Sequence, residues 1–276
     1  MSLIENIIYG IVSGLTEFLP VSGRGHQTLL HHLFGVGTRS SLQDLLVHIG
    51  ILLSVIVACS EYIAKLRWEQ QNAVTVSRNK SRHMDSNSRY DLRLIKSAIV
   101  PMLVCTVLLN VIVKTEWRLV SLIWLFLING VILLIAEHTR QGSRDARTMT
   151  GFDGMLMGVL SSASVLPGLS GTGIALSYST LRGADVQKAV NWVIMLVVPT
   201  MLFAMVGDVI TIFGSGFGTI SLMTIIGCVL SGIAAFCGGL VGISILRLLA
   251  VNLSVFQFSY YSYGIALLFF MLNLFT

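Results

Sequence analysis

The hydrophobic positions of this chain gather into long runs instead of the short periodic stretches of a soluble domain. A helix that crosses a bilayer needs about 20 mostly apolar residues. Six runs meet that length, at residues 44–64, 94–113, 118–137, 189–212, 219–248 and 258–275. The pattern therefore predicts an all-α integral membrane protein with six transmembrane helices.

Two further apolar stretches, 3–38 and 151–182, are each broken near the middle by small and polar residues. The breaks read "LPVSGRGH" at 19–26 and "LPGLSGTG" at 166–173. Non-helical backbone at membrane depth is tolerated only where it is buried in protein or lines a wet cavity. We therefore expect two re-entrant helical hairpins, whose breaks are the candidate sites.

The basic residues are distributed unevenly between the links that join these segments. With re-entrant hairpins, most Lys and Arg fall on the side that receives the links 65–93, 138–150, 182–188 and 249–257. The other side receives both termini and the links 39–43, 114–117 and 213–218. By the positive-inside rule, the basic links are cytoplasmic, and the termini and the mouth of the first hairpin lie outside.

The order of segments, a hairpin and three spans followed by another hairpin and three spans, predicts two inverted repeats, at about 1–139 and 150–276. Together they form a single membrane domain, 1–276, with 65–93 as a flexible cytoplasmic loop. Inversion lets the two broken tips meet near the midplane, as in transport folds. A G-x-x-x-G motif precedes each break, starting at Gly10 and at Gly154, and this spacing lets helices approach closely.

Composition agrees with a membrane protein, because 54% of the residues are hydrophobic and 11% are charged, against about 25% charged in soluble domains. The net charge of +5 lies in the links without a basic domain, which argues against nucleic-acid binding. The four cysteines, Cys59, Cys105, Cys228 and Cys237, stand singly, so neither a zinc site nor a redox pair is indicated. Residues 3–20 lack a basic leader and are interpreted as mature structure.

Ionisable residues at the first break are the candidates for chemistry. Glu17 is a carboxylate within an apolar segment, and such residues mark functional sites by default. Arg24 can supply the opposite charge, and His26 is a candidate general acid or base. We expect Glu17 and His26 to be catalytic. No dedicated metal-ligand spacing occurs, so the metal ligands are left unassigned, with Glu17 as a candidate.

The glycines and serines of the breaks indicate an anion site. Backbone N–H groups at a glycine-rich turn that leads into a helix can hold phosphate, and the arginine fork suits phosphate oxygens. The expected binding residues are Ser22, Arg24, Gly25, Ser170, Gly171 and Thr172, with Ser13, Asp44 and His48 in a second tier.

These residues resemble the undecaprenyl-pyrophosphate phosphatase family, the bacitracin-resistance membrane phosphatases. "GLTEFLPVSGRGH" at 14–26 resembles its E-G-x-T-E-F-L-P-V-S-S-T-G-H, "QDLLVHIG" at 43–50 its F-D-x-x-x-H-x-G, and "LPGLSGTG" its P-G-x-S-R-S-G. The resemblance implies two re-entrant hairpins in inverted repeats. It also implies removal of one phosphate from a C55 isoprenyl pyrophosphate at the outer face of a bacterial plasma membrane, with Mg²⁺ or Ca²⁺ as cofactor. A homodimer is left open.

Four positions depart from the family pattern. Ser13 stands for a glutamate, Gly23 for a serine, Arg24 for a threonine, and Gly171 for the arginine expected to hold the pyrophosphate. We hypothesise that the guanidinium comes from the first loop instead of the second. The alternative to a phosphatase is a catalytically degenerate carrier that moves a polyprenyl phosphate or another anionic amphiphile across the membrane.

Overall fold

The computed structural model describes residues 1–36, 40–75, 86–112, 119–139, 142–214, 221–252 and 255–275. In these residues the secondary structure is helical, apart from one isolated bridge between Arg144 and Ala184. The elements are α1 (Leu3–Phe18), α2 (Gly23–Leu33), α3 (Ser41–Ala58), α4 (Ser60–Thr75), α5 (Ser86–Ile112), α6 (Leu119–Glu137), α7 (Gly151–Ser161), η1 (Ser162–Val165), α8 (Gly171–Leu181), α9 (Val186–Gly214), α10 (Leu222–Asn252), η2 (Val255–Gln257) and α11 (Phe258–Phe275).

Six helical segments of this part of the chain are long and apolar enough to cross a membrane, which confirms the predicted number. They are Ser41–Ala58, Ser88–Ile112, Val120–Glu137, Val186–Gly214, Leu222–Val251 and Val255–Leu274. Large apolar side chains face outward along them, and Ile112 and Leu222 are more than 70% exposed. Such a surface is suited to lipid and not to water.

The largest difference from the predicted boundaries lies around the basic loop. The range 65–93 was expected to be a loop, but α4 extends to Thr75 and α5 begins at Ser86. A search for apolar runs misses these turns because their sequences are polar. Residues 76–85 lie outside the described residues, as do the link 114–117 and parts of the links 39–43, 138–150, 213–218 and 249–257.

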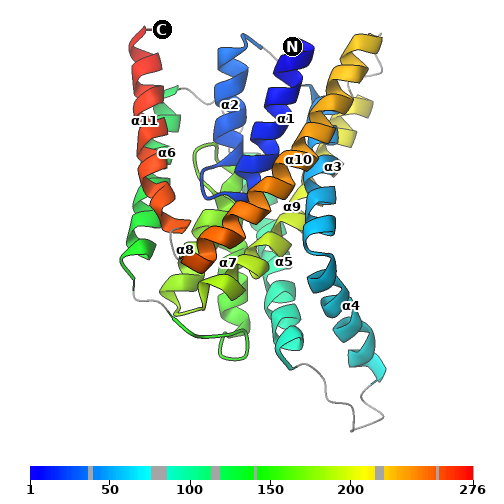
Figure 1. The fold of residues 1–276 in the computed structure, drawn as a ribbon, viewed down its shortest axis with the longest axis vertical. Coiled ribbons are helices and arrows are strands. Elements are labelled where there is room, and N and C mark those ends of the chain that lie inside the picture. Colours follow the sequence, from blue (N-terminus) through cyan, green and yellow to red (C-terminus); the bar gives the residue numbers. More distant parts are fainter. Residues whose placement is uncertain are drawn as a thin grey trace.

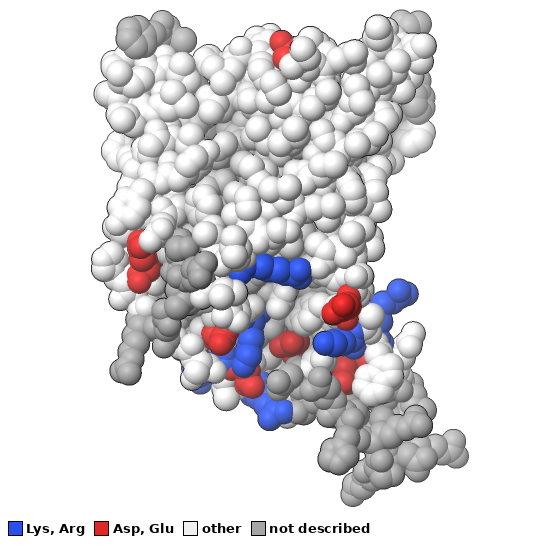
Figure 2. Space-filling model, in the orientation of Figure 1, with Lys and Arg blue, Asp and Glu red and all other residues white. Residues whose placement is uncertain are grey.

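Each interrupted stretch forms a helix, a break and a second helix. In Figure 1, α1 and α2 lie side by side at the end of the molecule that carries both termini, while α7 and α8 lie toward the opposite end. The coloured Lys and Arg side chains also gather toward that opposite end (Figure 2). Three candidate spans follow each pair of helices, in the predicted order.

The two helix pairs pack reciprocally on the candidate spans of the other half through their glycine motifs. A Cβ atom on Gly14 of α1 would overlap the carbonyl oxygen of Ala235 in α10. A Cβ atom on Gly158 of α7 would overlap the carbonyl oxygen of Ala98 in α5. The glycines therefore allow backbone-to-backbone contact, as the sequence predicted.

Asp153 joins the start of α7 to the end of α8, at the end of the second helix pair that lies away from the break. Its carboxylate accepts hydrogen bonds from the backbone and hydroxyl of Thr150 at 2.8 and 2.7 Å, from Tyr178 at 3.0 Å and from Arg182 at 2.7 Å. Burial raises the pKa of Asp153, but these hydrogen bonds outweigh burial and lower the pKa to about 2. The ionised carboxylate therefore caps α7 and ties it to the end of α8.

Candidate active site

The two breaks contact each other, and a serine at the start of the following helix organises each one. Ser22 caps α2, and its hydroxyl accepts hydrogen bonds from the N–H of Gly25 at 3.2 Å and of Gly168, in the second break, at 2.8 Å. Ser22 has a φ of 69°, a conformation that costs a non-glycine residue about 1–3 kcal/mol and clusters at functional sites.

Ser170 has the equivalent position in the second break. It caps α8 by accepting a hydrogen bond from the N–H of Gly173 at 3.1 Å, and its hydroxyl donates to the carbonyl of Leu19 in the first break at 3.4 Å. Each serine therefore caps its own helix and bonds to the opposite loop. The prediction that the two tips meet is confirmed.

Asn129 of α6 joins both breaks, and the sequence analysis did not identify it. Its side chain donates to the carbonyl of Pro20 at 3.1 Å and to the hydroxyl of Ser262 in α11 at 3.0 Å, and it accepts from the N–H of Ser170 at 2.9 Å. The side chain is fully buried. The only available signal was an amide within an apolar run.

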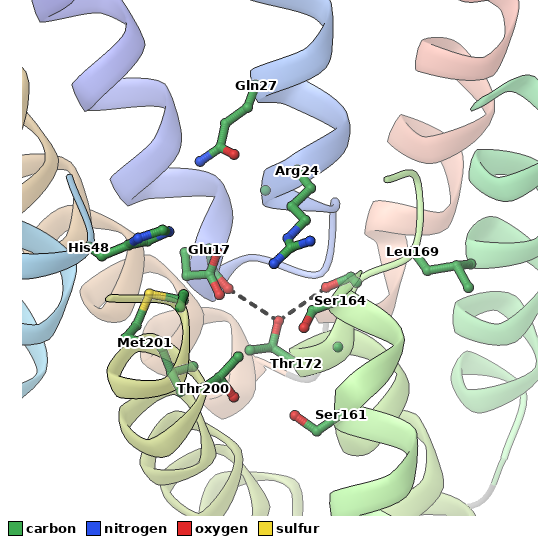
Figure 3. Close-up of a pocket in the computed structure, with 15 residues that line it drawn as sticks. Glu17, Arg24, Gln27, His48, Ser161, Ser164, Leu169, Thr172, Thr200 and Met201 are labelled. Atoms are coloured by element: carbon green, nitrogen blue, oxygen red, sulfur yellow. Dashed lines mark hydrogen bonds between the residues drawn. The ribbon is translucent and has the colours of Figure 1, made fainter. Parts of the chain in front are cut away.

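A cavity of about 40 Å³ lies where the breaks meet α3 and α9. Of the predicted residues, it is lined by Glu17, Arg24, His48, Ser170, Gly171 and Thr172. Figure 3 shows Glu17 between His48 and Arg24, with Thr172 across from them. The sequence analysis missed four polar lining residues, Gln27, Ser161, Ser164 and Thr200. They form no motif along the chain, and only the folded structure brings them to one cavity.

Positive groups surround the cavity from both halves of the chain. Gly23 and Gly171, the first residues of α2 and α8, both line it, so two helix N-termini with their partial positive charge face one space. Arg24 reaches across from α2 and donates to the carbonyl of Val165 at 3.3 Å. Its guanidinium therefore lies beside the second break, as the hypothesis that the first loop supplies the guanidinium requires.

Acceptors and hydroxyls complete the lining. The Glu17 carboxylate lies close to Gly23, where a Cβ atom would be 2.8 Å from Oε2. The Thr172 hydroxyl donates to the Glu17 carbonyl at 3.4 Å and lies 3.1 Å from the hydroxyl of Ser170. A carboxylate, an imidazole, a guanidinium and five hydroxyls around one space can bind a phosphate anion and move a proton to or from it.

His26 lies outside the cavity lining. Its Nδ1 is 2.8 Å from the carbonyl oxygen of Ser22, and its Nε2 is 2.7 Å from the hydroxyl of Tyr261. The ring also contacts Phe126 edge-on at 5.9 Å between centroids. Both ring nitrogens are therefore engaged in holding the first break against α6 and α11.

Four other predicted residues also lie outside the lining. Ser22 is buried between the two breaks, and Gly25 packs against Phe126. Ser13 is fully buried in α1. Asp44 accepts a hydrogen bond from Tyr9 at 2.9 Å. The structure thus brings the loop residues of the prediction together but separates most of the second tier from the cavity.

The described residues do not form a protein-held metal site. Within the described ranges, no group of three or more His, Cys, Asp or Glu side chains is placed to hold a metal ion. Glu17 is the one carboxylate among the cavity residues. A protein cage for Mg²⁺ or Ca²⁺ needs more oxygen ligands than this.

Known proteins align with nearly the whole length of this chain. Undecaprenyl-diphosphatase of Treponema denticola is 30% identical over 267 residues, covering 95% of this chain and 94% of the relative. Undecaprenyl-diphosphatase of Alkaliphilus metalliredigens is 28% identical over 275 residues, covering 96% of each chain. The sequence model of bacitracin resistance protein BacA matches residues 6–268. This chain, with six candidate spans around the two joined breaks, therefore belongs to the BacA family of multi-pass membrane proteins.

Proposed function

We propose that this protein is an undecaprenyl-diphosphatase, which hydrolyses undecaprenyl pyrophosphate to undecaprenyl phosphate and inorganic phosphate. The observation that carries the proposal is the cavity between the two breaks, where two helix N-termini and Arg24 face Glu17. A pyrophosphate head group matches this charge distribution. The names of the full-length relatives favour a hydrolase over a polyprenyl-phosphate carrier.

Within this proposal, the residues divide into two groups. Arg24, Ser170 and Thr172 hold the phosphates, because they line the cavity from both breaks. Glu17 contributes its carboxylate to proton transfer. His26 has a positioning role, because hydrogen bonds to Ser22 and Tyr261 engage both of its ring nitrogens. A divalent cation would enter with the pyrophosphate, whose own oxygens are suited to Mg²⁺.

The orientation in the membrane is also a proposal. Both termini lie at one end and the coloured basic side chains lie toward the other, so the positive-inside rule puts the termini outside and the basic links in the bacterial cytoplasm. In whole cells, a membrane-impermeant maleimide should then label Ser2→Cys and not Ser143→Cys. Equal labelling of both, or the reverse, would contradict this orientation.

Phosphate release tests the activity. Purified protein in detergent should release inorganic phosphate from C55 pyrophosphate with Mg²⁺ or Ca²⁺. Glu17→Gln, which keeps the shape of the side chain but removes its proton-accepting charge, should lower the rate by about 10²–10⁴-fold. Glu5→Gln is the matched control, because Glu5 lies in the first turn of the same helix, where its carboxylate accepts the N–H of Ser2. No release by wild type above the Glu17→Gln level would contradict the hydrolase.

A further inference from the structure

His48 and Asp208 form a pair that no local sequence motif reveals. They come from α3 and α9, two different candidate spans, and the Nδ1 atom of His48 lies 2.7 Å from Oδ2 of Asp208. The side chains are 16% and 17% exposed, so the pair is largely buried. A carboxylate at Nδ1 fixes the orientation of the ring and puts the ring proton on that nitrogen.

Because Asp208 holds Nδ1, Nε2 is the ring nitrogen that is available for proton transfer. Among the described residues, Asp208 is the one hydrogen-bond partner of the His48 side chain. The ring lines the same cavity as Glu17 and Arg24 (Figure 3). The charged groups that face the ring are therefore Asp208 from α9, Glu17 from α1 and, beyond Glu17, Arg24 from α2.

The contrast with His26 separates a catalytic arrangement from a structural one. Both ring nitrogens of His26 are engaged by Ser22 and Tyr261, so accepting a proton there would break an existing contact. His48 has one nitrogen held by a carboxylate and the other available at a polar cavity. A histidine that served only to join α3 to α9 would not need this second feature.

We propose that His48, oriented by Asp208, is the general base of the hydrolysis, which extends the activity proposed above and depends on it. Nε2 takes a proton from the attacking water as the water oxygen bonds to the terminal phosphorus. The bond from that phosphorus to the bridging oxygen breaks, and its electron pair leaves with undecaprenyl phosphate. The imidazolium, stabilised by Asp208, then returns its proton to solvent by way of the Glu17 carboxylate, which lines the same cavity. His48 is the catalytic residue and Asp208 the positioning residue.

Kinetics of three variants test the assignment. His48→Gln should lower kcat for phosphate release by about 10²–10⁴-fold, the usual contribution of a general base, with KM changed less than about threefold. Asp208→Asn should lower kcat by about 10–100-fold. The double variant should be no slower than His48→Gln, because the two residues act as one unit. His138→Gln is the matched control, since His138 is exposed and directly follows the last residue of α6.

Two readouts separate chemistry from structure. The acidic limb of the wild-type kcat/KM profile against pH should disappear in His48→Gln, because a base must be neutral to accept a proton. Added imidazole should restore activity to His48→Ala and not to Glu17→Gln. Both results can be obtained even if His48→Gln is less stable, since they compare rates within one variant.

The outcomes distinguish this inference from the proposed function. If wild type releases phosphate and His48→Gln keeps a third or more of the wild-type kcat, the general base is refuted and the hydrolase stands. A lost kcat without imidazole rescue and with an unchanged acidic limb also refutes it. If wild type releases no phosphate, both proposals fail.

Discussion

Restoring the family's arginine at Gly171 should harm this protein, because the backbone leaves no room for a side chain there. A Cβ atom on Gly171 would overlap the carbonyl oxygen of Ser161 and lie 2.9 Å from the Cβ atom of Ser164. These neighbours are the end of α7 and the η1 turn, which are backbone or short side chains and cannot swing away. The end of α7 would have to move.

The cost can be estimated from the single added carbon. Overpacking of a closed site costs about 1–3 kcal/mol, and replacing glycine by alanine returns about 0.4–1 kcal/mol through the unfolded state. Gly171→Ala should therefore lose up to about 2.6 kcal/mol of stability, which corresponds to a fall of up to roughly 10 °C in the thermal midpoint. Gly171→Arg should lose at least as much and release phosphate more slowly than wild type.

Thermal unfolding in detergent and phosphate release measure both effects. Gly151→Ala is the matched control, because an added Cβ atom at the start of α7 meets nothing within 4 Å, and its midpoint should not fall. A Gly171→Arg protein with the wild-type midpoint and a several-fold higher rate would refute this reasoning. That result would mean that the second break opens to admit an arginine.

Three further predictions concern the loops and the second helix pair. Arg24→Ala and Arg24→Lys should both raise KM for the pyrophosphate by tenfold or more, because lysine lacks the planar fork. An unchanged KM in purified Arg24→Ala would refute the hypothesis that the first loop supplies the guanidinium. Asn129→Leu should lower the thermal midpoint by an amount equivalent to about 2 kcal/mol or more, since it strands buried polar groups of both breaks, whereas a midpoint equal to wild type would show that they are satisfied otherwise. The pKa of Asp153 is lowered in the folded state to about 2, so its stabilisation is complete above about pH 4 and is lost as the pH falls toward 2. Asp153→Asn should therefore flatten that acid transition, and an unaltered transition would contradict the assignment.

The local features of the fold could be predicted because each rests on a short stretch of sequence. Six apolar runs gave six candidate spans, and Pro/Ser/Gly clusters at 19–26 and 166–173 marked where helices end and restart. The contact between the two breaks followed from an inversion that was inferred by counting crossings. The glycine motifs of α1 and α7 indicated close packing, although not the helices they would contact.

The remainder of the site depends on tertiary pairing, which spacing along the chain does not contain. His48 and Asp208 are separated by 160 residues, and nothing near either one indicates the other. Asn129 lies in an apolar run with no motif of its own, and its role depends on the meeting of two distant loops and α11. For His26, the sequence predicts a catalytic role, and that prediction does not include the two contacts, to Ser22 and Tyr261, that engage its ring nitrogens in the fold.

The two departures from the family pattern, arginine at position 24 and glycine at position 171, should be energetically coupled and not independent. With glycine at position 171, the start of α8 packs directly on the carbonyl of Ser161, so an arginine side chain at this position has no room unless the backbone moves. Arg24 comes from the opposite helix pair and donates a hydrogen bond to the carbonyl of Val165, the last residue of η1. An arginine restored at Gly171 would therefore meet the backbone of Ser161 and the positive charge of Arg24 together. Adding Arg24→Thr to Gly171→Arg relieves the second conflict, so the double variant should be more active than the sum of the two single losses predicts. Strict additivity would mean that the guanidinium of Arg24 and the residue at 171 do not share one position.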